Sequence, residues 1–574
     1  MKYNEKRVSN SEVQPTITHQ GGTGLTQKPE YELIGILSTG LDNTYYEKET
    51  EREIRFKEVL NKVASKGVKS VLFAAKALIY ARTVFGQRSV THYGAVEMIP
   101  HLSGSELAKR FFSKRDRKEN RGGIIYRLDD MAEILACYQA KNGIDAPIPN
   151  AIKKGFKDAI EHTDAYVLAK YQMKSRGVSL VDIVNLVHPI ATKIQGTITV
   201  TEDEYQKSIK GTKFSIGHKD YKAEYANIPV RTEKGVEIPT LHALILGLLK
   251  QFNTVEDKNT DVGKTVAEKV KKGEITAEQA VVELNEAKTE NYKELIETKK
   301  IGYLALLRNV RNILKTNDTV LLDKACEMLV QQDFIRKSLV WPTQIDVALE
   351  IMTLEFSGAR MAKVTKALGT AYELAIPNLQ QLLPEGRSAI VFDTSGSMDG
   401  GYNTIYLDAK KTINKKPAEK AALIAATFAK GVNGDVYHFA SGSEQITGWN
   451  PNDSVNTLKQ KFMGYNGRQG HGTDFGACFK LFEHMNKQYD RVIIISDEQD
   501  GYGNVESNYK DYCKKFGTPY VYIINICGYA VTAPIKGGDR VFRLYGYNQD
   551  LYDKITQIEI NPQVIIEEIN KIEI

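Results

Sequence analysis

Four short runs of consecutive apolar residues in the last third of the chain most restrict its possible folds. They lie in "SAIVFDTS", "GDVYHFAS", "DRVIIISDE" and "TPYVYIINICGY", and segments with helical spacing such as "AEKAALIAATFAKG" separate them. Continuous apolar strands that alternate with helices are typical of a parallel sheet covered on both faces. We therefore predict an α/β domain over residues 384–574, with ligand sites at the carboxyl ends of its strands.

Residues 29–383 have helical spacing almost throughout. "EIRFKEVLNKVASKG" and "LDDMAEILACYQAKNG" carry apolar residues three and four positions apart and end near Gly, as helices often do. Strand-like alternation occurs only near "TKIQGTITVTEDEY". Paired helices that cannot bury their faces alone predict a stacked, all-α helical solenoid here. Within it, the Lys- and Glu-rich residues 253–300 are interpreted as a solvated helical excursion. The polar residues 1–28 are interpreted as a flexible tail.

Cysteine usage and hydropathy exclude several classes of protein. The five cysteines are widely spaced and form no C-x-x-C pair, which argues against a disulfide framework or a zinc site. No run approaches the roughly 18 apolar residues that a bilayer span needs. The first residues, "MKYNEKRVSNSEVQPTITHQGGTG", contain no apolar signal region. We therefore expect a cytoplasmic protein without membrane contact.

Oxygen-bearing side chains follow the predicted strands of the α/β domain. "IVFDTSGSMDG" places Asp393, Ser395 and Ser397 at the end of one strand. "GHGTDFG" places Thr473 at a Gly-rich helix entry, and "IIISDEQD" places Asp497 just beyond another strand. Carboxylate and hydroxyl oxygens without a softer ligand suit Mg²⁺. The spacing therefore predicts a divalent metal site at this edge, with Mg²⁺ as the expected ion.

Other readings of the first loop are a simple turn and a catalytic site. Asp, Ser and Gly all favour turns, so "DTSGS" taken alone is compatible with a polar strand-to-helix connection. Aspartic proteases require a D-T-G or D-S-G turn, whereas this loop reads Asp-Thr-Ser. The chain also has no Walker-type phosphate loop and no Ser and His that the sequence places together.

The order D-x-S-x-S, then Gly-Thr-Asp, then a strand-terminal Asp is similar to the metal-ion-dependent adhesion site of von Willebrand factor A domains. The resemblance covers the last third of the chain and implies a Rossmann-like fold. It also implies one open metal position for an acidic group of a partner. The metal ligands that it implies are Asp393, Ser395, Ser397 and Thr473, with Asp497 bound directly or through water.

Positive charge is concentrated in the first part of the chain. Residues 1–383 carry 56 Lys and Arg against 48 Asp and Glu, whereas residues 384–574 carry 21 against 23. A polyanionic partner is therefore expected on the first part.

Three basic clusters there are candidates for RNA contact. In the first, cations surround Phe111 and Phe112 and could neutralise phosphates while the rings stack on bases. Each cluster also has a reading without RNA binding: the charged residues could form solvated helix faces, His188 could cap a helix, and Arg88 could pair with a carboxylate. The candidate residues are Lys109, Arg110, Lys114, Arg115, Arg117, Lys118 and Arg121 in the first cluster, Lys170, Lys174, Arg176 and His188 in the second, and Arg88 and His92 in the third.

The order of several motifs resembles the TROVE module of the Ro autoantigen family, in a form like its bacterial or phage members. These motifs include "GQRSVTH", "GYLALLRNVRNI", "WPTQIDVALEIM" and Tyr-Tyr-x-Lys-Glu from Tyr45 to Glu49. The resemblance runs from about Lys28 to the C-terminus. It implies a ring of HEAT-like helical repeats over residues 29–383, closed by the A-type domain within a single, monomeric chain.

The same resemblance implies a function in RNA quality control. Ro proteins bind small Y RNAs on the outer surface, and single-stranded 3′ ends of misfolded RNA enter the hole of the ring. The Y RNA face matches Lys170, Lys174, Arg176 and His188, whereas the run from Lys109 to Arg121 is our own assignment to the hole or its rim. Bacterial relatives can work with a 3′ exonuclease such as polynucleotide phosphorylase. We therefore expect an RNA-binding adaptor that is not itself an enzyme.

Two other functions fit parts of the sequence. A metal-dependent, adhesion-type protein-binding module with a helical scaffold explains the oxygen-rich loops but leaves the basic excess unexplained. A Mg²⁺-dependent phosphohydrolase needs a nucleophile or a two-metal carboxylate cluster, and only Asp393 and Asp497 stand at predicted strand ends. The sequence does not identify the RNA or the group at the open metal position.

Overall fold

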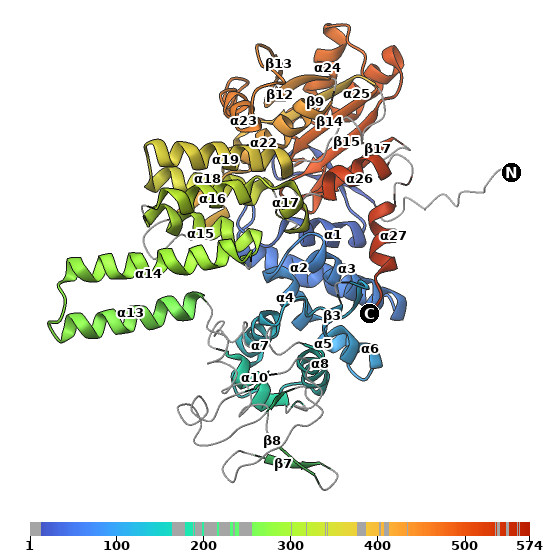
Figure 1. Cartoon of the computed structure of the whole chain (residues 1–574). Coiled ribbons are helices and arrows are strands. Elements are labelled where there is room, and N and C mark those ends of the chain that lie inside the picture. Colours follow the sequence, from blue (N-terminus) through green and yellow to red (C-terminus); the bar gives the residue numbers. More distant parts are fainter. Residues whose placement is uncertain are drawn as a thin grey trace. The chain divides into compact units, whose positions relative to one another are not determined.

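The chain forms two compact units, and Figure 1 labels the helices and strands of the whole chain. Unit 1 consists of Met1–Val63 and Ile296–Glu568, and unit 2 of Ala64–Leu295 and Ile569–Ile574. The computed structural model describes residues 13–116, 118–163, 178–187, 189, 198–199, 215–216, 230–233, 236–239, 255–299, 301–316, 318–338, 340, 342–375, 386–400, 403–406, 412–432, 434–533, 535, 540–546, 550–558, 561 and 563–574.

A six-stranded, mostly parallel sheet organises the last part of unit 1, as the apolar runs predict. In spatial order its strands are β13 (Ser443–Ile446), β12 (Gly434–Phe439), β9 (Ser388–Asp393), β14 (Arg491–Ser496), β15 (Tyr520–Asn525) and β17 (Val541–Tyr545). All neighbours pair in parallel except β12 and β13. The first strand of the sheet in sequence, β9, lies between β12 and β14. Sheets of this kind bind ligands at such a reversal of strand order.

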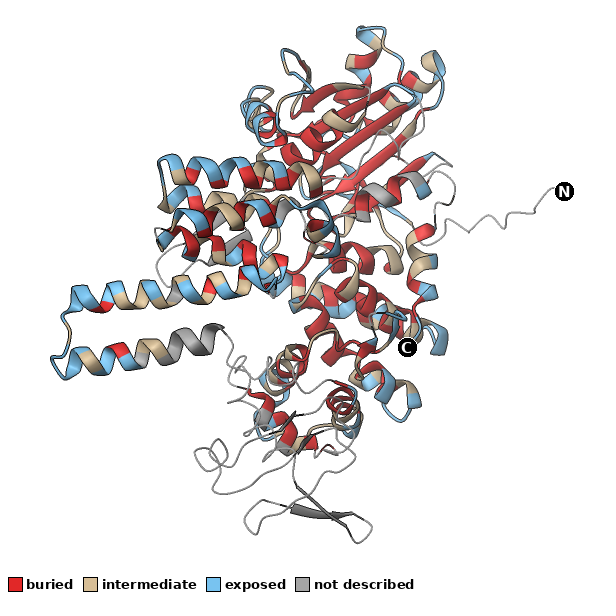
Figure 2. Cartoon of the chain, viewed as in Figure 1, coloured by how far each residue is buried: buried red, intermediate tan, exposed pale blue. Residues whose placement is uncertain are grey.

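Helices cover both faces of this sheet. Phe462 of α23 (Val455–Met463) stacks on Phe392 of β9, while α22 (Pro417–Gly431) packs against β9, β12 and β14. The neighbouring Val391 belongs instead to a core with Phe479 of α24 (Ala477–His484) and Tyr512 of α25 (Val505–Phe516). Because successive strand side chains point to opposite faces, strands packed on both faces are apolar throughout. Figure 2 shows the strands buried along their lengths.

The rest of unit 1 is largely helical. α16 packs against α15 and α19, and α18 against α19. Helix α1 packs against β17, and two helices follow β17 in sequence, α26 and then α27 (Val564–Lys571), which crosses the border of the unit. The helices are α1 (Pro29–Thr39), α2 (Glu49–Ala64), which runs to the border of the unit, α15 (Tyr303–Lys315), α16 (Thr319–Leu329), α17 (Gln332–Ser338), α18 (Pro342–Glu355), α19 (Ala359–Ala375) and α26 (Asp550–Ile558).

Unit 2 is also helix-rich. Its described helices are α3 (Val68–Thr83), α4 (Ser89–Glu97), α5 (Ile99–Leu102), α6 (Glu106–Phe111), α7 (Asp129–Asn142), α8 (Asn150–Glu161), α10 (Leu180–Val187), α13 (Val255–Lys271) and α14 (Ala277–Glu297), whose end crosses the border. Short strands pair as β3 (Arg115–Asp116) with β4 (Arg121–Gly122), β5 (Ile198–Thr199) with β6 (Ser215–Ile216), and β7 (Val230–Glu233) with β8 (Val236–Pro239). β5 lies in the segment where the sequence shows strand-like alternation.

The fold class predicted from the sequence, a helix-rich part followed by an α/β domain, is confirmed. The Lys- and Glu-rich stretch forms α13 and α14, which run side by side and are joined by an ion pair between Lys269 and Glu283 (Figure 1). The ring of helical repeats stays a prediction. Among the described residues, no helix combines the length and apolar character that a membrane span requires.

The flexible tail predicted for residues 1–28 is wrong for the part that the structure describes. β1 (Pro15–Ile17) and β2 (Thr23–Thr26) form an antiparallel hairpin, and β2 pairs with β16 (Val531–Thr532) of the α/β domain. We call residues 15–26 the N-terminal hairpin. Its partner strand lies about five hundred residues away in sequence, so local polarity cannot reveal the pairing.

Candidate functional site

The loop after β9 brings three of the predicted metal ligands together. The strand ends at Asp393, whose Oδ1 accepts a hydrogen bond from the backbone N–H of Ser395 at 2.8 Å. Ser395 stands at the N-cap position of the short helix α21 (Gly396–Asp399), and its Oγ lies 3.2 Å from that of Ser397. Asp393 Oδ2 accepts a hydrogen bond from Ser496 Oγ, at the end of β14, at 2.6 Å. The loop therefore holds its oxygens at the carboxyl edge of adjacent strands.

The other two predicted ligands come from loops at the same edge of the sheet. Asp497 directly follows β14, and its Oδ1 accepts a hydrogen bond from the backbone N–H of Gln499 at 3.1 Å. Its Oδ2 is buried and has no hydrogen-bond partner within the described part of the chain. The carbonyl of Thr473 accepts from the backbone N–H of Gly501 at 2.8 Å, which ties its loop to the one after β14.

We call Asp393, Ser395, Ser397, Thr473 and Asp497 the oxygen cluster. None of these residues is more than 2% exposed. Burial raises the pKa of Asp393 to about 6, against hydrogen bonds from Ser395 and Ser496 that lower it. Burial and the adjacent charge of Asp393 raise the pKa of Asp497 to about 7. Two carboxylates without a nearby cation are therefore costly to ionise here.

The oxygen cluster fits a hard divalent cation. Its donors are carboxylates and hydroxyls, which suit Mg²⁺, and the unpartnered Asp497 Oδ2 is one acceptor that a cation would satisfy. Among the described residues, no group of three or more His, Cys, Asp or Glu side chains forms another candidate centre. All five cysteines are unpaired in the structure.

Residues that the sequence does not single out as ligands also reach the cluster. Gln20 of the N-terminal hairpin donates from Nε2 to Thr473 Oγ1 at 2.7 Å. Burial raises the pKa of Tyr46 to about 12, against the side chains of Gln20 and Ser397, which lower it. Tyr46 belongs to the Tyr-Tyr-x-Lys-Glu motif, so the sequence does mark this tyrosine as part of a recognisable motif. Gln20 lies in a polar stretch without any such signal.

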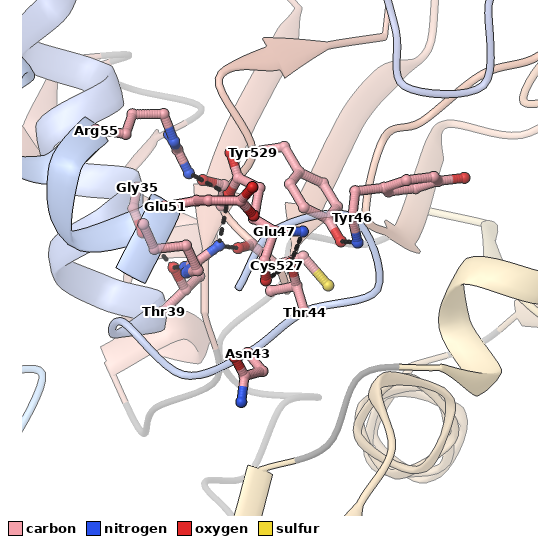
Figure 3. Close-up of polar contacts among 12 residues, drawn as sticks. Gly35, Thr39, Asn43, Thr44, Tyr46, Glu47, Glu51, Arg55, Cys527 and Tyr529 are labelled. Atoms are coloured by element: carbon pink, nitrogen blue, oxygen red, sulfur yellow. Dashed lines mark hydrogen bonds and ion pairs between the residues drawn. The ribbon is translucent and has the colours of Figure 1, made fainter. Parts of the chain in front are cut away.

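The loop that carries Tyr46 is fixed by two arginines of α2, as Figure 3 shows in part. Arg52 is 1% exposed and donates to the backbone carbonyls of Cys527, at 2.8 Å, and Gly40, at 2.7 Å. Arg55 donates to the Gly528 carbonyl at 2.9 Å and forms an ion pair with Glu47 at 2.8 Å (Figure 3). These contacts fasten residues 40–48 to the loop after β15.

The third basic cluster is not a free surface. His92 is 2% exposed, and its Nε2 lies 2.9 Å from Asp130 Oδ1, so its assignment to RNA is wrong. Arg82 donates to the same carboxylate at 2.9 Å. Burial alone would raise the pKa of Asp130, but the hydrogen bond with His92 and the charge of Arg82 hold it well below its usual range. Arg88 pairs with Asp129 at 2.8 Å, which is the alternative that its sequence context left open.

The first basic cluster divides into structural and surface residues. Arg115 is 1% exposed and donates to the carbonyls of Gly122, at 2.6 Å, and Glu573, at 2.7 Å, so its assignment to RNA is wrong. Lys114 donates to the His162 carbonyl. The two phenylalanine rings are buried and cannot stack on bases. Lys109, Arg110, Lys118 and Arg121 are exposed, and Arg121 pairs with Glu119.

The remaining candidates for RNA contact lie outside the described residues. They are Arg117, Lys170, Lys174, Arg176 and His188.

Comparisons with known proteins give structural similarity only. No protein-family model matches the sequence, and no curated protein matches it. The conserved hypothetical protein BatB from Bacteroides thetaiotaomicron is 16% identical over 32% of this chain and 100% of its own, with a TM-score of 0.22. An aerotolerance-related membrane protein from Bacteroides fragilis is 16% identical over 33% of this chain and 98% of its own, with a TM-score of 0.19. Over 93% of its length and 100% of that protein, the chain is similar to the Ro (RSR) protein of Deinococcus radiodurans, with 14% identity and a TM-score of 0.45.

Proposed function

We propose that this chain is a Ro-type RNA-binding protein that acts as an adaptor rather than as a nuclease. The ordered TROVE-like motifs support this assignment, and the excess of positive charge lies in the part of the chain that carries most of them. The structural observation that supports the proposal most directly is the solvent exposure of three cations. They are Lys109 and Arg110 of α6 and Lys118 of the β3–β4 hairpin. Cations at a surface bind phosphates without reading sequence.

The burial of Phe111 and Phe112 refines the expected mode of contact. Both rings pack in the interior, at most 1% exposed. The surface at α6 therefore offers charge without a stacking platform, which suits a phosphate backbone better than splayed bases. The first RNA that we expect to bind is a Y-like small noncoding RNA, whose stem contacts Lys170, Lys174, Arg176 and His188. The second is misfolded RNA, whose single-stranded 3′ end contacts the exposed cations near α6. A 3′ exonuclease such as polynucleotide phosphorylase would then process the RNA.

We further propose that the oxygen cluster holds one Mg²⁺ ion. The supporting observations are the hydroxyl and carboxylate donors, the raised carboxyl pKa values and the unpartnered oxygen of Asp497. Bound Mg²⁺ supplies positive charge that offsets the two buried carboxylates. The chain's own contribution is to hold Asp393 through Ser395 and Ser496, so that its oxygens stay at the strand edge.

The test is equilibrium binding of a stem-loop RNA with a single-stranded 3′ tail across a salt series, with and without EDTA. We expect tight binding that falls steeply with salt, survives EDTA and weakens in the Lys170→Ala/Lys174→Ala/His188→Ala variant. Lys109→Ala/Arg110→Ala should reduce the logarithmic salt slope by about two, because each lost phosphate contact releases about one counterion fewer.

Matched controls separate local contacts from net charge. Lys271→Ala/Lys272→Ala removes two exposed cations at the end of α13 and should leave RNA binding unchanged. Equal losses in both double variants would mean that only overall charge matters. Binding no tighter than that of an unrelated basic protein would favour the metal-dependent protein-binding module instead. Metal-dependent RNA cleavage by the pure protein would contradict the adaptor role.

A further inference from the structure

The oxygen cluster is closed to solvent by other parts of unit 1. Every one of its side chains is buried. An open metal position for an acidic partner requires a path from solvent to the cluster. The described contacts show instead which of the chain's own residues lie over it.

The turn of the N-terminal hairpin forms one half of the cover. Besides the contact of Gln20 with Thr473, the backbone N–H of His19 donates to Gln499 Oε1 at 3.0 Å. Thr18 is 4% exposed, and its hydroxyl donates to the backbone carbonyl of Asp500. The turn is therefore bonded both to a cluster residue and to the loop that follows Asp497.

The turn of the N-terminal hairpin packs closely against the loop that follows β14. Two backbone hydrogen bonds close the turn, from Thr18 to the Gly22 carbonyl at 2.9 Å and from Gly21 to the Thr18 carbonyl at 3.0 Å. A Cβ atom placed on Gly22 would lie 2.3 Å from the carbonyl oxygen of Asp500. Only glycine therefore allows the turn to approach this loop so closely.

Tyr46 forms the other half of the cover. The hydroxyl of Tyr46 lies close enough to the side chains of Gln20 and Ser397 for both to lower its pKa. Its ring stacks on His19 at 4.8 Å between centroids and meets the buried Tyr529 edge-on at 5.7 Å. The contacts of Arg52 with Cys527 and of Arg55 with Gly528 hold the backbone of this loop in place. The turn of the N-terminal hairpin and the loop of Tyr46 thus pack against each other beside the cluster.

We infer that Gln20 and Tyr46 cover the open ligand position of the metal site, so that the group lying over this position is the chain's own N-terminal segment and not another protein. The inference rests on the proposed Mg²⁺ site. A neutral amide and a phenol at this place close the site without adding charge, because the Gln20 amide donates to the ligand Thr473 and such outer hydrogen bonds orient metal ligands. Metal binding and docking of the N-terminal hairpin then stabilise each other.

The test uses Mn²⁺ as a paramagnetic probe on the full chain. Electron paramagnetic resonance gives the Mn²⁺ affinity, and water-proton relaxation reports how readily solvent reaches the bound ion. We expect low water access in the natural chain. Gln20→Ala should weaken Mn²⁺ binding by about tenfold, as loss of an outer hydrogen-bond partner usually does, and should raise water access.

Two more variants probe the cover by other means. Gly22→Ala should raise water access by forcing the turn away from Asp500, and Tyr46→Phe should do so by removing only the hydroxyl. Gln14→Ala is the matched control, because Gln14 is exposed and directly precedes the same hairpin. Gln14→Ala should change neither the Mn²⁺ affinity nor the water access.

The outcomes separate the inference from the function on which it rests. If the natural chain binds no Mn²⁺, the metal site itself is wrong. If it binds Mn²⁺ with affinity and water access that Gln20→Ala, Gly22→Ala and Tyr46→Phe all leave unchanged, the metal site stands and the internal cover is overturned. High water access in the natural chain would also overturn it.

Discussion

A single carboxylate, Asp130, organises the centre of unit 2. It accepts hydrogen bonds from Arg82 and His92 and from the backbone N–H groups of Tyr126 and Arg127, and none of its surface is exposed. A buried charge of this kind is stable only while its partners remain. The residues that resemble an RNA-binding cluster in sequence therefore serve to join α3, α4 and α7.

Removing the negative charge of Asp130 should destabilise the folded protein. Asp130→Asn leaves the buried Arg82 without its counter-charge, and we expect the free energy of unfolding to fall by about 3–5 kcal/mol. Urea denaturation followed by circular dichroism measures the change. Asp129→Asn is the control, because its partner Arg88 is partly exposed and such pairs contribute only about 0–1 kcal/mol. Similar losses in both variants would contradict the central role of Asp130.

The carboxylates of the oxygen cluster should make stability depend on pH. Their pKa values of about 6 and about 7 exceed the unfolded value of about 4. Between about pH 4 and about pH 7 the metal-free folded protein therefore binds more protons than the unfolded chain, and the free energy of unfolding falls as pH rises. Thermal melting in EDTA should show this fall.

Mg²⁺ should counteract the fall, because the ion replaces the protons. We expect it to raise the melting temperature more at about pH 8 than at about pH 5. Asp497→Asn should flatten both the EDTA profile and the Mg²⁺ effect. An equal Mg²⁺ response at both pH values would contradict the assignment of the ion to these carboxylates.

At the scale of helices and strands, the sequence predicts those elements whose apolar residues follow a regular local spacing. The strands β9, β12, β14 and β15 follow from continuous apolar runs, and the oxygen cluster follows from their ends. The N-terminal hairpin does not, because its polar residues gain their order from the distant β16. Charge in the sequence likewise does not distinguish the buried Arg115 from the exposed Lys109.

The contact between α6 and α8 gives a test at this scale. A Cβ atom on Gly155 of α8 would lie 2.6 Å from the backbone of Phe112. Gly155→Ala should therefore push the two elements apart and lower the free energy of unfolding by about 1–3 kcal/mol, as measured by urea denaturation.

Gly263→Ala provides the matched control for Gly155→Ala. Gly263 also lies in a helix, α13, but nothing stands within 4 Å of its added Cβ. This substitution should stabilise the helix by up to about 1 kcal/mol, because alanine has the higher helix propensity. A loss of stability at both positions would show that packing against Phe112 is not the cause.

At the scale of the whole molecule, the chain passes between its two units three times. Residues 569–574 return to unit 2 after the α/β domain is complete. There the Gly122 backbone N–H donates to the Glu573 carbonyl at 2.9 Å, and Arg115 donates to the same carbonyl. The β3–β4 hairpin therefore depends on the last residues of the chain.

Deleting residues 569–574 should expose this dependence. Hydrogen exchange measured by mass spectrometry should show faster exchange at β3 and β4, because a buried arginine loses an acceptor and a strand loses its partner. Glu573→Ala keeps the backbone carbonyl and should exchange like the natural chain. Unchanged protection of residues 115–122 after the deletion would contradict this account.

The return of the C-terminus also determines the order in which the protein can be completed during synthesis. A ribosome releases the N-terminal residues first, and domains generally fold as contiguous pieces emerge. Here no contiguous piece encodes either unit, so unit 2 waits for residues 569–574 although most of it is translated early. A translation product that stops before residue 569 therefore lacks a finished unit 2, and a contiguous gene fragment cannot transfer either unit alone to another protein.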